Sequence, residues 1–108
     1  MAKAAWNLKD GVAAITGAGS GIGAALAIEL ARRGMHLALA DRHTSALEAT
    51  AEQARQAGTT VSTHAFDLTD RAMSAAWPQA VLAQHGRVTL LVNNAGIVSP
   101  ISCGRGRS

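Results

Sequence analysis

Short apolar runs alternate along this chain with longer segments in which apolar residues recur at helical spacing. The short runs are bounded by Gly, Ser or Asp and predict β-strands. The longer segments predict amphipathic helices, most of which end at a glycine. The predicted strands are Val12–Thr16, Leu37–Ala40, Thr60–Phe66 and Val88–Val92. The predicted helices are Gly21–Arg33, Ser45–Ala57 and Asp70–His85.

The regular alternation of strand and helix predicts an α/β fold with a parallel sheet and right-handed crossovers. We expect one half of a doubly wound sheet, with four strands in the order 3-2-1-4. The predicted domain covers residues 1–98. Residues 99–108 are rich in Gly, Ser and Arg and show no apolar period, so we expect a loose tail.

Two local signals concern the helix ends and interiors. Thr44 precedes the second predicted helix and is a plausible N-cap, because its hydroxyl can accept a hydrogen bond from a free backbone N–H. Pro78 lies inside the third predicted helix. Because proline lacks an N–H and clashes with the preceding turn, we expect a kink or a break near Trp77.

The composition predicts a globular protein and gives no sign of a nucleic-acid-binding face or a metal site. Apolar residues make up 48% of the 108 residues and charged residues 16%, which is typical of a globular core and not of a disordered chain. The formal net charge of +3 includes Arg105 and Arg107 near the C-terminus, so we expect no basic face for nucleic acid. The spacing of the four histidines does not indicate a metal site.

Cysteine usage and targeting signals indicate a cytoplasmic protein. The single cysteine, Cys103, cannot form an internal disulfide, which fits a reducing compartment. Residues 1–10 contain no apolar signal-peptide core. No apolar run approaches the ~20 residues that a membrane span needs, so we expect no membrane partner.

A glycine-rich run, Thr16–Gly23 (TGAGSGIG), joins the first predicted strand to the first helix. This context is the one in which such a run binds a dinucleotide. Backbone N–H groups at a helix N-terminus attract a pyrophosphate, and a Cβ at Gly17 or Gly21 would block the turn or the approach. Gly23 would let the helix pack closely on the strand. The alternative is a glycine-rich turn without a ligand.

Asp41 ends the second predicted strand, where a carboxylate can accept hydrogen bonds from the adenosine ribose hydroxyls and repel a 2′-phosphate. The alternative is an acidic residue that merely favours the dipole of the following helix. Arg42 comes next, and its guanidinium could instead favour a phosphate. Ser20 in the glycine run adds no positive charge, so we expect NAD, with NADP less favoured.

Polar residues also follow the third and fourth predicted strands. The Asp67 carboxylate could accept from the adenine amino group while the Leu68 N–H donates to the ring, or Asp67 could cap the following helix. After the fourth strand comes Asn93–Gly96 (NNAG). Its small residues would let a nicotinamide ribose approach, and its asparagines could fix loop backbone groups. The alternative is an ordinary turn.

Together these motifs resemble the short-chain dehydrogenase/reductase family over about residues 7–98. The resemblance rests on TGxxxGIG, an acid after strand two, DL after strand three and NNAG after strand four. It implies a Rossmann-like fold and NAD(P)-dependent hydride transfer on an alcohol or carbonyl substrate. It implies that Asn93 braces the sheet and that the dinucleotide is contacted by Gly17, Ser20, Ile22, Asp41, Asp67, Leu68, Asn94 and Gly96. We add to this cofactor-binding set the neighbouring Gly19, Gly21, Gly23, Arg42 and Ala95.

The chain departs from the family in its catalytic residues. Family members are more than twice as long and carry a catalytic serine and a Tyr-x-x-x-Lys pair, of which the tyrosine exchanges the proton. This chain has no tyrosine, and it has no lysine beyond Lys9. We therefore assign no catalytic residue. We expect a chain truncated near Ile101, followed by out-of-frame sequence, and an exposed fourth-strand edge that promotes self-association.

Three interpretations of function remain open. The first is an oxidoreductase of this family whose chemistry is lost or supplied by a missing segment. The second is a module that binds NAD without catalysis. The third is a non-functional remnant that does not fold stably. The absence of tyrosine argues against autonomous catalysis and does not separate the second interpretation from the third.

Overall fold

The computed structural model describes residues 9–94, which form four strands and three helices in strict alternation. In chain order the elements are β1 (Val12–Thr16), α1 (Gly21–Arg32), β2 (His36–Asp41), α2 (Thr44–Arg55), β3 (Val61–Ala65), α3 (Arg71–His85) and β4 (Leu90–Asn93). Each agrees with the predicted element to within two residues at either end, which confirms the α/β class.

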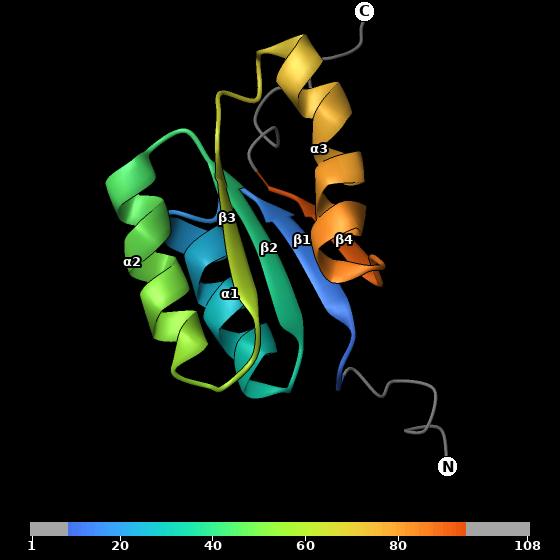
Figure 1. The fold of residues 1–108 in the computed structure, drawn as a ribbon. Helices are drawn as coiled ribbons and strands as arrows, with labels where there is room; N and C mark the ends of the chain where they lie inside the picture. Colours follow the sequence, from blue (N-terminus) through green and yellow to red (C-terminus); the bar gives the residue numbers. More distant parts are fainter. Residues whose placement is uncertain (1–8, 95–108) are drawn as a thin grey trace, which may run out of the picture.

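The four strands form one parallel sheet in the order β3-β2-β1-β4 (Figure 1). This order confirms the prediction. In the register, Thr16 at the end of β1 lies beside Ala40 of β2 and Asn93 of β4. The strand order therefore reverses between β1 and β4, and the carboxyl ends of the strands meet at the same edge of the sheet.

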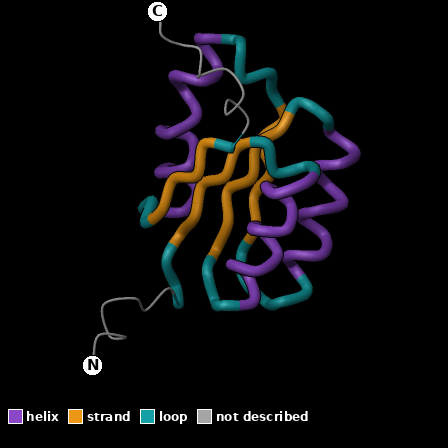
Figure 2. Tube along the Cα trace, turned by 180° about the vertical axis from the view of Figure 1, so that it is seen from behind, coloured by secondary structure: helices purple, strands orange, loops and turns teal. Residues whose placement is uncertain are grey.

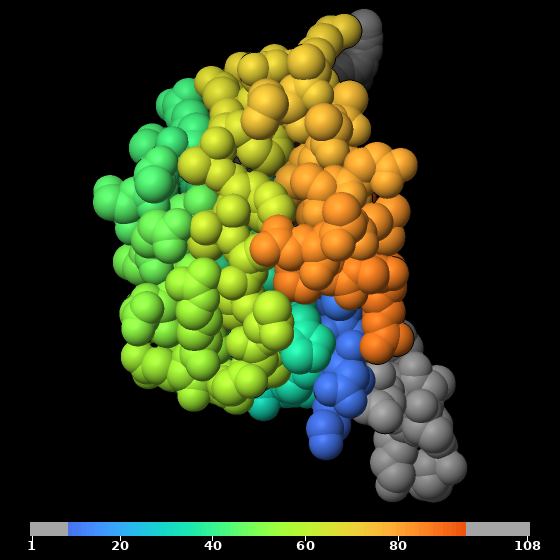
Figure 3. Space-filling view, in the orientation of Figure 1, coloured from blue at the N-terminus to red at the C-terminus, as the bar shows by residue number. Residues whose placement is uncertain are grey.

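Helices cover both faces of the sheet, α1 and α2 on one face and α3 on the other (Figures 1 and 2). Because side chains alternate along a strand, β1 supplies both cores: Ala13 and Ile15 pack toward α1 and α2, whereas Val12 and Ala14 pack toward α3. This double burial explains why β1 is a continuous apolar run. Figure 3 shows the second face, with α3 in orange over the sheet and β3 in yellow-green beside it.

Of the kink or break predicted near Trp77, the structure excludes the break. α3 is one continuous helix with Pro78 inside it. Trp77 and Val81, on either side of the proline, are both buried against small residues of β1 and β2. Packing on one sheet surface keeps the two turns in one helix and outweighs the single backbone hydrogen bond that proline cannot make.

The start of α2 also differs from the prediction. His43 is the N-cap and Thr44 is the first helical residue. The carbonyl oxygen of His43 accepts the first helical hydrogen bond, from Leu47, so the helix begins one residue earlier than a threonine cap would allow. Asp70, predicted as the first residue of the third helix, is instead the N-cap of α3, because its carboxylate accepts from the N–H groups of Ala72 and Met73.

β4 is the least buried strand. It begins two residues later than predicted, at Leu90, and pairs only with β1 among the described strands. Leu90 and Leu91 are 37% and 64% exposed. Within residues 9–94, no helix is long and apolar enough to span a membrane.

Candidate functional site

A cleft of about 380 Å³ opens at the carboxyl edge of the sheet. All four strands deliver residues to it, each at or just after the strand's last residue. The lining residues are Gly17, Ser20, Asp41, Arg42, His43, Asp67, Leu68, Thr69 and Asn94. This is the position at which open α/β sheets bind ligands, and the volume lies within the usual range for a small-molecule site.

The glycine run shapes one wall of the cleft. Gly17 and Gly21 have φ angles of 65° and 58°, in the left-handed region that favours glycine. The turn leads directly into α1, whose N-cap, Ser20, makes no side-chain cap hydrogen bond. The first N–H groups of a helix have no partner within it, so this end of α1 is suited to an anion.

Gly23 explains how closely α1 approaches the loop. A Cβ at this position would lie 2.2 Å from the carbonyl oxygen of Gly17 and 2.9 Å from Nδ2 of Asn94. Neither a backbone oxygen nor a half-buried amide can move far enough to accommodate it. Gly23 therefore permits a close approach as predicted, but to the Gly17 backbone and the Asn94 side chain and not to a strand.

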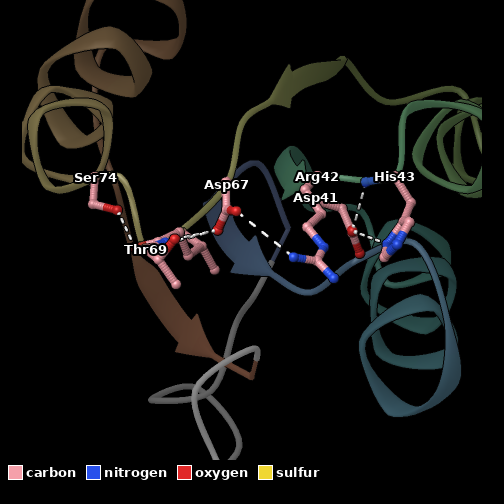
Figure 4. A network of polar contacts seen from close by, with 7 residues as sticks. Asp41, Arg42, His43, Asp67, Thr69 and Ser74 are labelled. Atoms are coloured by element: carbon pink, nitrogen blue, oxygen red, sulfur yellow. Dashed lines mark hydrogen bonds and ion pairs between the residues drawn. The ribbon is translucent and has the colours of Figure 1, made fainter.

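Asp41 is held at the end of β2 by two backbone donors. Its Oδ2 accepts from the N–H of Gly19 at 2.8 Å. Its Oδ1 accepts from the N–H of His43 at 3.0 Å (Figure 4). Burial opposes the charge, but the hydrogen bonds from His43 and Gly19 outweigh it, and the pKa of Asp41 lies below its ordinary value. The cleft thus contains a fixed carboxylate, ionised at neutral pH.

Arg42 and Asp67 face each other across the cleft, from the ends of neighbouring strands. Nη1 of Arg42 lies 3.6 Å from Oδ2 of Asp67 (Figure 4). Asp67 also accepts from the N–H and hydroxyl of Thr69, at 2.9 and 2.8 Å. These Thr69 bonds, followed by the charge of Arg42, lower the pKa of Asp67. Asp67 is not the cap of α3, because Asp70 fills that role.

The two asparagines at the end of β4, of which Asn93 is its last residue, fasten this strand to β1. Asn93 Oδ1 accepts from the Thr16 hydroxyl at 3.1 Å, and the Thr16 hydroxyl accepts from the N–H of Asn94 at 2.9 Å. Asn94 Nδ2 donates to the Gly17 carbonyl oxygen at 3.3 Å. Asn93 therefore braces the sheet, and Asn94 fixes the backbone of the glycine run.

The cleft brings together seven of the thirteen residues of the predicted cofactor-binding set. Gly19, Gly21 and Gly23 shape the loop without lining the cleft, and Ile22 is 75% exposed and does not line it either. Ala95 and Gly96 lie outside the described residues, as does the predicted tail 99–108.

Sequence reasoning missed two lining residues, His43 and Thr69. Thr69 follows Asp67 by two positions, and such Asp-x-Thr spacing is typical of a turn in which the carboxylate binds the next backbone N–H. That spacing could have predicted that Thr69 lies beside Asp67 in the cleft. Nothing in the sequence marks His43, because its role depends on where β2 ends. Among residues 9–94, no three His, Cys, Asp or Glu side chains are placed to hold a metal ion.

Comparison with known proteins agrees with this geometry. A family model described as short chain dehydrogenase matches residues 11–105. An uncharacterized oxidoreductase of Mycobacterium tuberculosis is 39% identical over 95 residues, which are 88% of this chain and 36% of that protein. The chain belongs to the short-chain dehydrogenase family.

Solved structures of the same family superpose closely on the described fold. A xylitol dehydrogenase bound to NAD⁺ matches with a TM-score of 0.79 and 32% identity, over 82% of this chain and 34% of its own. A metagenomic short-chain oxidoreductase in complex with NADP matches with a TM-score of 0.77 and 42% identity, over 83% of this chain and 41% of its own. The chain spans about a third or less of the curated relatives that it matches.

Proposed function

We propose that the cleft binds a nicotinamide dinucleotide and favours NAD over NADP. The observation that carries this proposal is the ionised, anchored carboxylate of Asp41 beside the free N-terminus of α1. The helix end suits a pyrophosphate, and the carboxylate suits the two ribose hydroxyls of NAD while repelling a 2′-phosphate. Family neighbours bound to NAD⁺ and to NADP support the dinucleotide class.

In this proposal, different residues of the cleft contact different parts of the cofactor. Gly17 and Ser20 lie where the pyrophosphate would meet the backbone of the glycine run. Asp41 would accept from the adenosine ribose, and Asp67 with Leu68 would contact the adenine. Asn94, with Ala95 and Gly96 after it, would lie beside the nicotinamide ribose, because β4 neighbours β1 at the point where strand order reverses.

The activity proposed for the protein to which these residues belong is hydride transfer between the nicotinamide and an alcohol or carbonyl. A bound nicotinamide supplies the hydride chemistry, and protein groups supply orientation and a proton partner. The 108 residues contain no tyrosine, which is the residue that exchanges the proton in the family. This absence favours a second candidate for the chain alone, namely cofactor binding without turnover.

The direct test is a thermal melt of the 108-residue chain, followed by circular dichroism, with and without millimolar NAD. A ligand that binds only the native state stabilises it by RT ln(1 + [L]/Kd), so we expect a cooperative transition that moves upward with NAD. AMP, which carries the adenosine without the pyrophosphate bridge, serves as the matched comparison and should give a smaller shift. A transition indifferent to NAD, or no transition, would overturn the proposal and favour a remnant without function.

A further inference from the structure

His43 directs its side chain at the Asp41 carboxylate. Its Nδ1 lies 3.2 Å from Oδ1 of Asp41, the same oxygen that accepts from the His43 backbone N–H (Figure 4). His43 is the N-cap of α2, yet its ring makes no cap hydrogen bond. The side chain is 68% exposed and lines the cleft. Its ring therefore contributes little to the fold. The ring faces the Asp41 carboxylate, which we propose accepts hydrogen bonds from the adenosine ribose.

The charges around this contact are few. Of the residues that line the cleft, those that carry or can gain a charge are Asp41, Arg42, His43 and Asp67. Arg42 from the end of β2 is paired with Asp67 from the end of β3, so these two charges offset each other. The N-terminus of α2 adds a partial positive charge beside the ring. The negative charge that is left without an opposite charge in the cleft is that of the Asp41 carboxylate. A proton on the His43 ring would neutralise this charge.

We infer that His43 is a specificity-determining residue, whose protonation weakens the discrimination of this site against a 2′-phosphate. This inference rests on the proposed dinucleotide function of the cleft. The 2′-hydroxyl of NAD is uncharged, whereas a phosphate at that position carries a charge of about −1.5 to −2 near pH 7. NAD responds to the charge of Asp41 only through hydrogen bonds from its ribose hydroxyls, whereas NADP also responds through the charge repulsion between the carboxylate and its 2′-phosphate. Histidine is the side chain whose charge changes between about pH 5 and pH 8, so discrimination depends on pH.

The test is the ratio of the Kd for NADP to the Kd for NAD, measured by calorimetry on the 108-residue chain at pH 5.5, 7.0 and 8.5 and constant ionic strength. We expect this ratio to fall about fivefold to tenfold from pH 8.5 to pH 5.5, which corresponds to one charge acting over a few ångströms in a largely aqueous site. The 2′-phosphate contributes to the fall, because its own second ionisation lies near pH 6. Variants separate the two contributions.

His43→Gln retains the size and hydrogen-bonding capacity of the side chain but cannot gain a charge. Its ratio should change with pH by the phosphate's contribution alone, and less than that of the wild type. His43→Lys carries a positive charge throughout, and its ratio at pH 8.5 should lie below that of the wild type. Circular dichroism of each variant verifies that it is folded.

A measurement on the unaltered chain makes the inference independent of the variants. Binding and protonation are reciprocally linked, so NADP should raise the midpoint of the His43 ring titration, followed by NMR, more than NAD does. Equal midpoints with the two cofactors, or the same pH dependence in wild type and His43→Gln, would overturn the inference while leaving NAD binding intact. A folded chain that binds no NAD at any pH would instead overturn the proposed function itself.

Discussion

Nδ2 of Asn94 donates a hydrogen bond to the carbonyl oxygen of Gly17 at 3.3 Å, although the two residues lie 77 positions apart in the chain. The same oxygen is the atom that a Cβ at Gly23 would strike. The end of β4 and the first turn of α1 therefore both fix the glycine run. A loop fixed in this way presents its N–H groups without having to be ordered by the ligand, which lowers the cost of binding.

Substitution of Asn94 by Asp tests this brace. The carboxylate would place an acceptor against the Gly17 carbonyl oxygen, so we expect the free energy of unfolding to fall by about 1–3 kcal/mol and NAD affinity to fall with it. Urea denaturation and calorimetry measure the two effects. Asn94→Ala removes the bond without opposing two acceptors and should cost less. Equal stability of both variants and the wild type would show that the contact does not support the loop.

The sequence was sufficient to predict the strands, their order and most of the cleft, for a physical reason. Buried parallel strands are continuous apolar runs, and the polar residues just after them must lie at one edge of the sheet. The pairing of Arg42 with Asp67 was not predictable from local pattern, because it joins the ends of two strands. The absence of a break at Pro78 was not predictable from local pattern either, because the burial of Trp77 and Val81, which keeps α3 continuous, is a tertiary effect.

Asp41→Asn is expected to weaken NAD binding about tenfold or more and to lower the ratio of the NADP Kd to the NAD Kd. The amide keeps the shape of the side chain but loses the ionised acceptor, and hydrogen bonds to a charged group contribute about 1.5–3 kcal/mol. Calorimetry with both cofactors measures the change. Asp70→Asn is the matched control, because it removes a carboxylate outside the cleft and asparagine caps a helix as well as aspartate does. Unchanged selectivity in Asp41→Asn would contradict the ribose role of Asp41.

Stability should fall as the pH falls below about 6.5, because two histidines converge on a buried serine. The Nε2 atoms of His64 and His85 lie 2.9 and 2.8 Å from the hydroxyl oxygen of Ser62. Burial lowers the pKa of both rings from the ordinary value of 6.5, assisted at His64 by His85 and at His85 by His36. The unfolded chain then binds more protons than the folded one, so stability is present above pH 6.5 and is lost on acidification.

Urea midpoints between pH 8 and pH 5 measure this loss. The window lies above the range in which Asp41 and Asp67 take up protons, because the pKa of each is lowered from 3.8. His64→Gln keeps a polar partner for Ser62 and should flatten the pH dependence, whereas Glu52→Gln, which alters a charge on the exposed part of α2, should leave it unchanged. A wild-type midpoint that is constant across the window would show that the His64–Ser62–His85 cluster is not linked to folding.

The outer edge of β4 should make the 108-residue chain self-associate. β4 pairs only with β1 among the described strands, and its backbone groups on the other side are suited to pairing with a further strand. Leu91 is 64% exposed there, and Val88 and Leu82 are 37% and 43% exposed. An apolar strand edge of this kind favours association between copies as concentration rises.

Sedimentation velocity from micromolar to millimolar concentration should show a rising mean mass, and Leu91→Lys should reduce it by adding a charge at the edge. Met73→Lys is the matched control, because Met73 is 46% exposed near the start of α3 and lies beside His64 and Ala65 of β3, at the opposite edge of the sheet. A chain that stays monomeric and monodisperse over this range, or one in which both lysine variants act alike, would show that the β4 edge does not drive association.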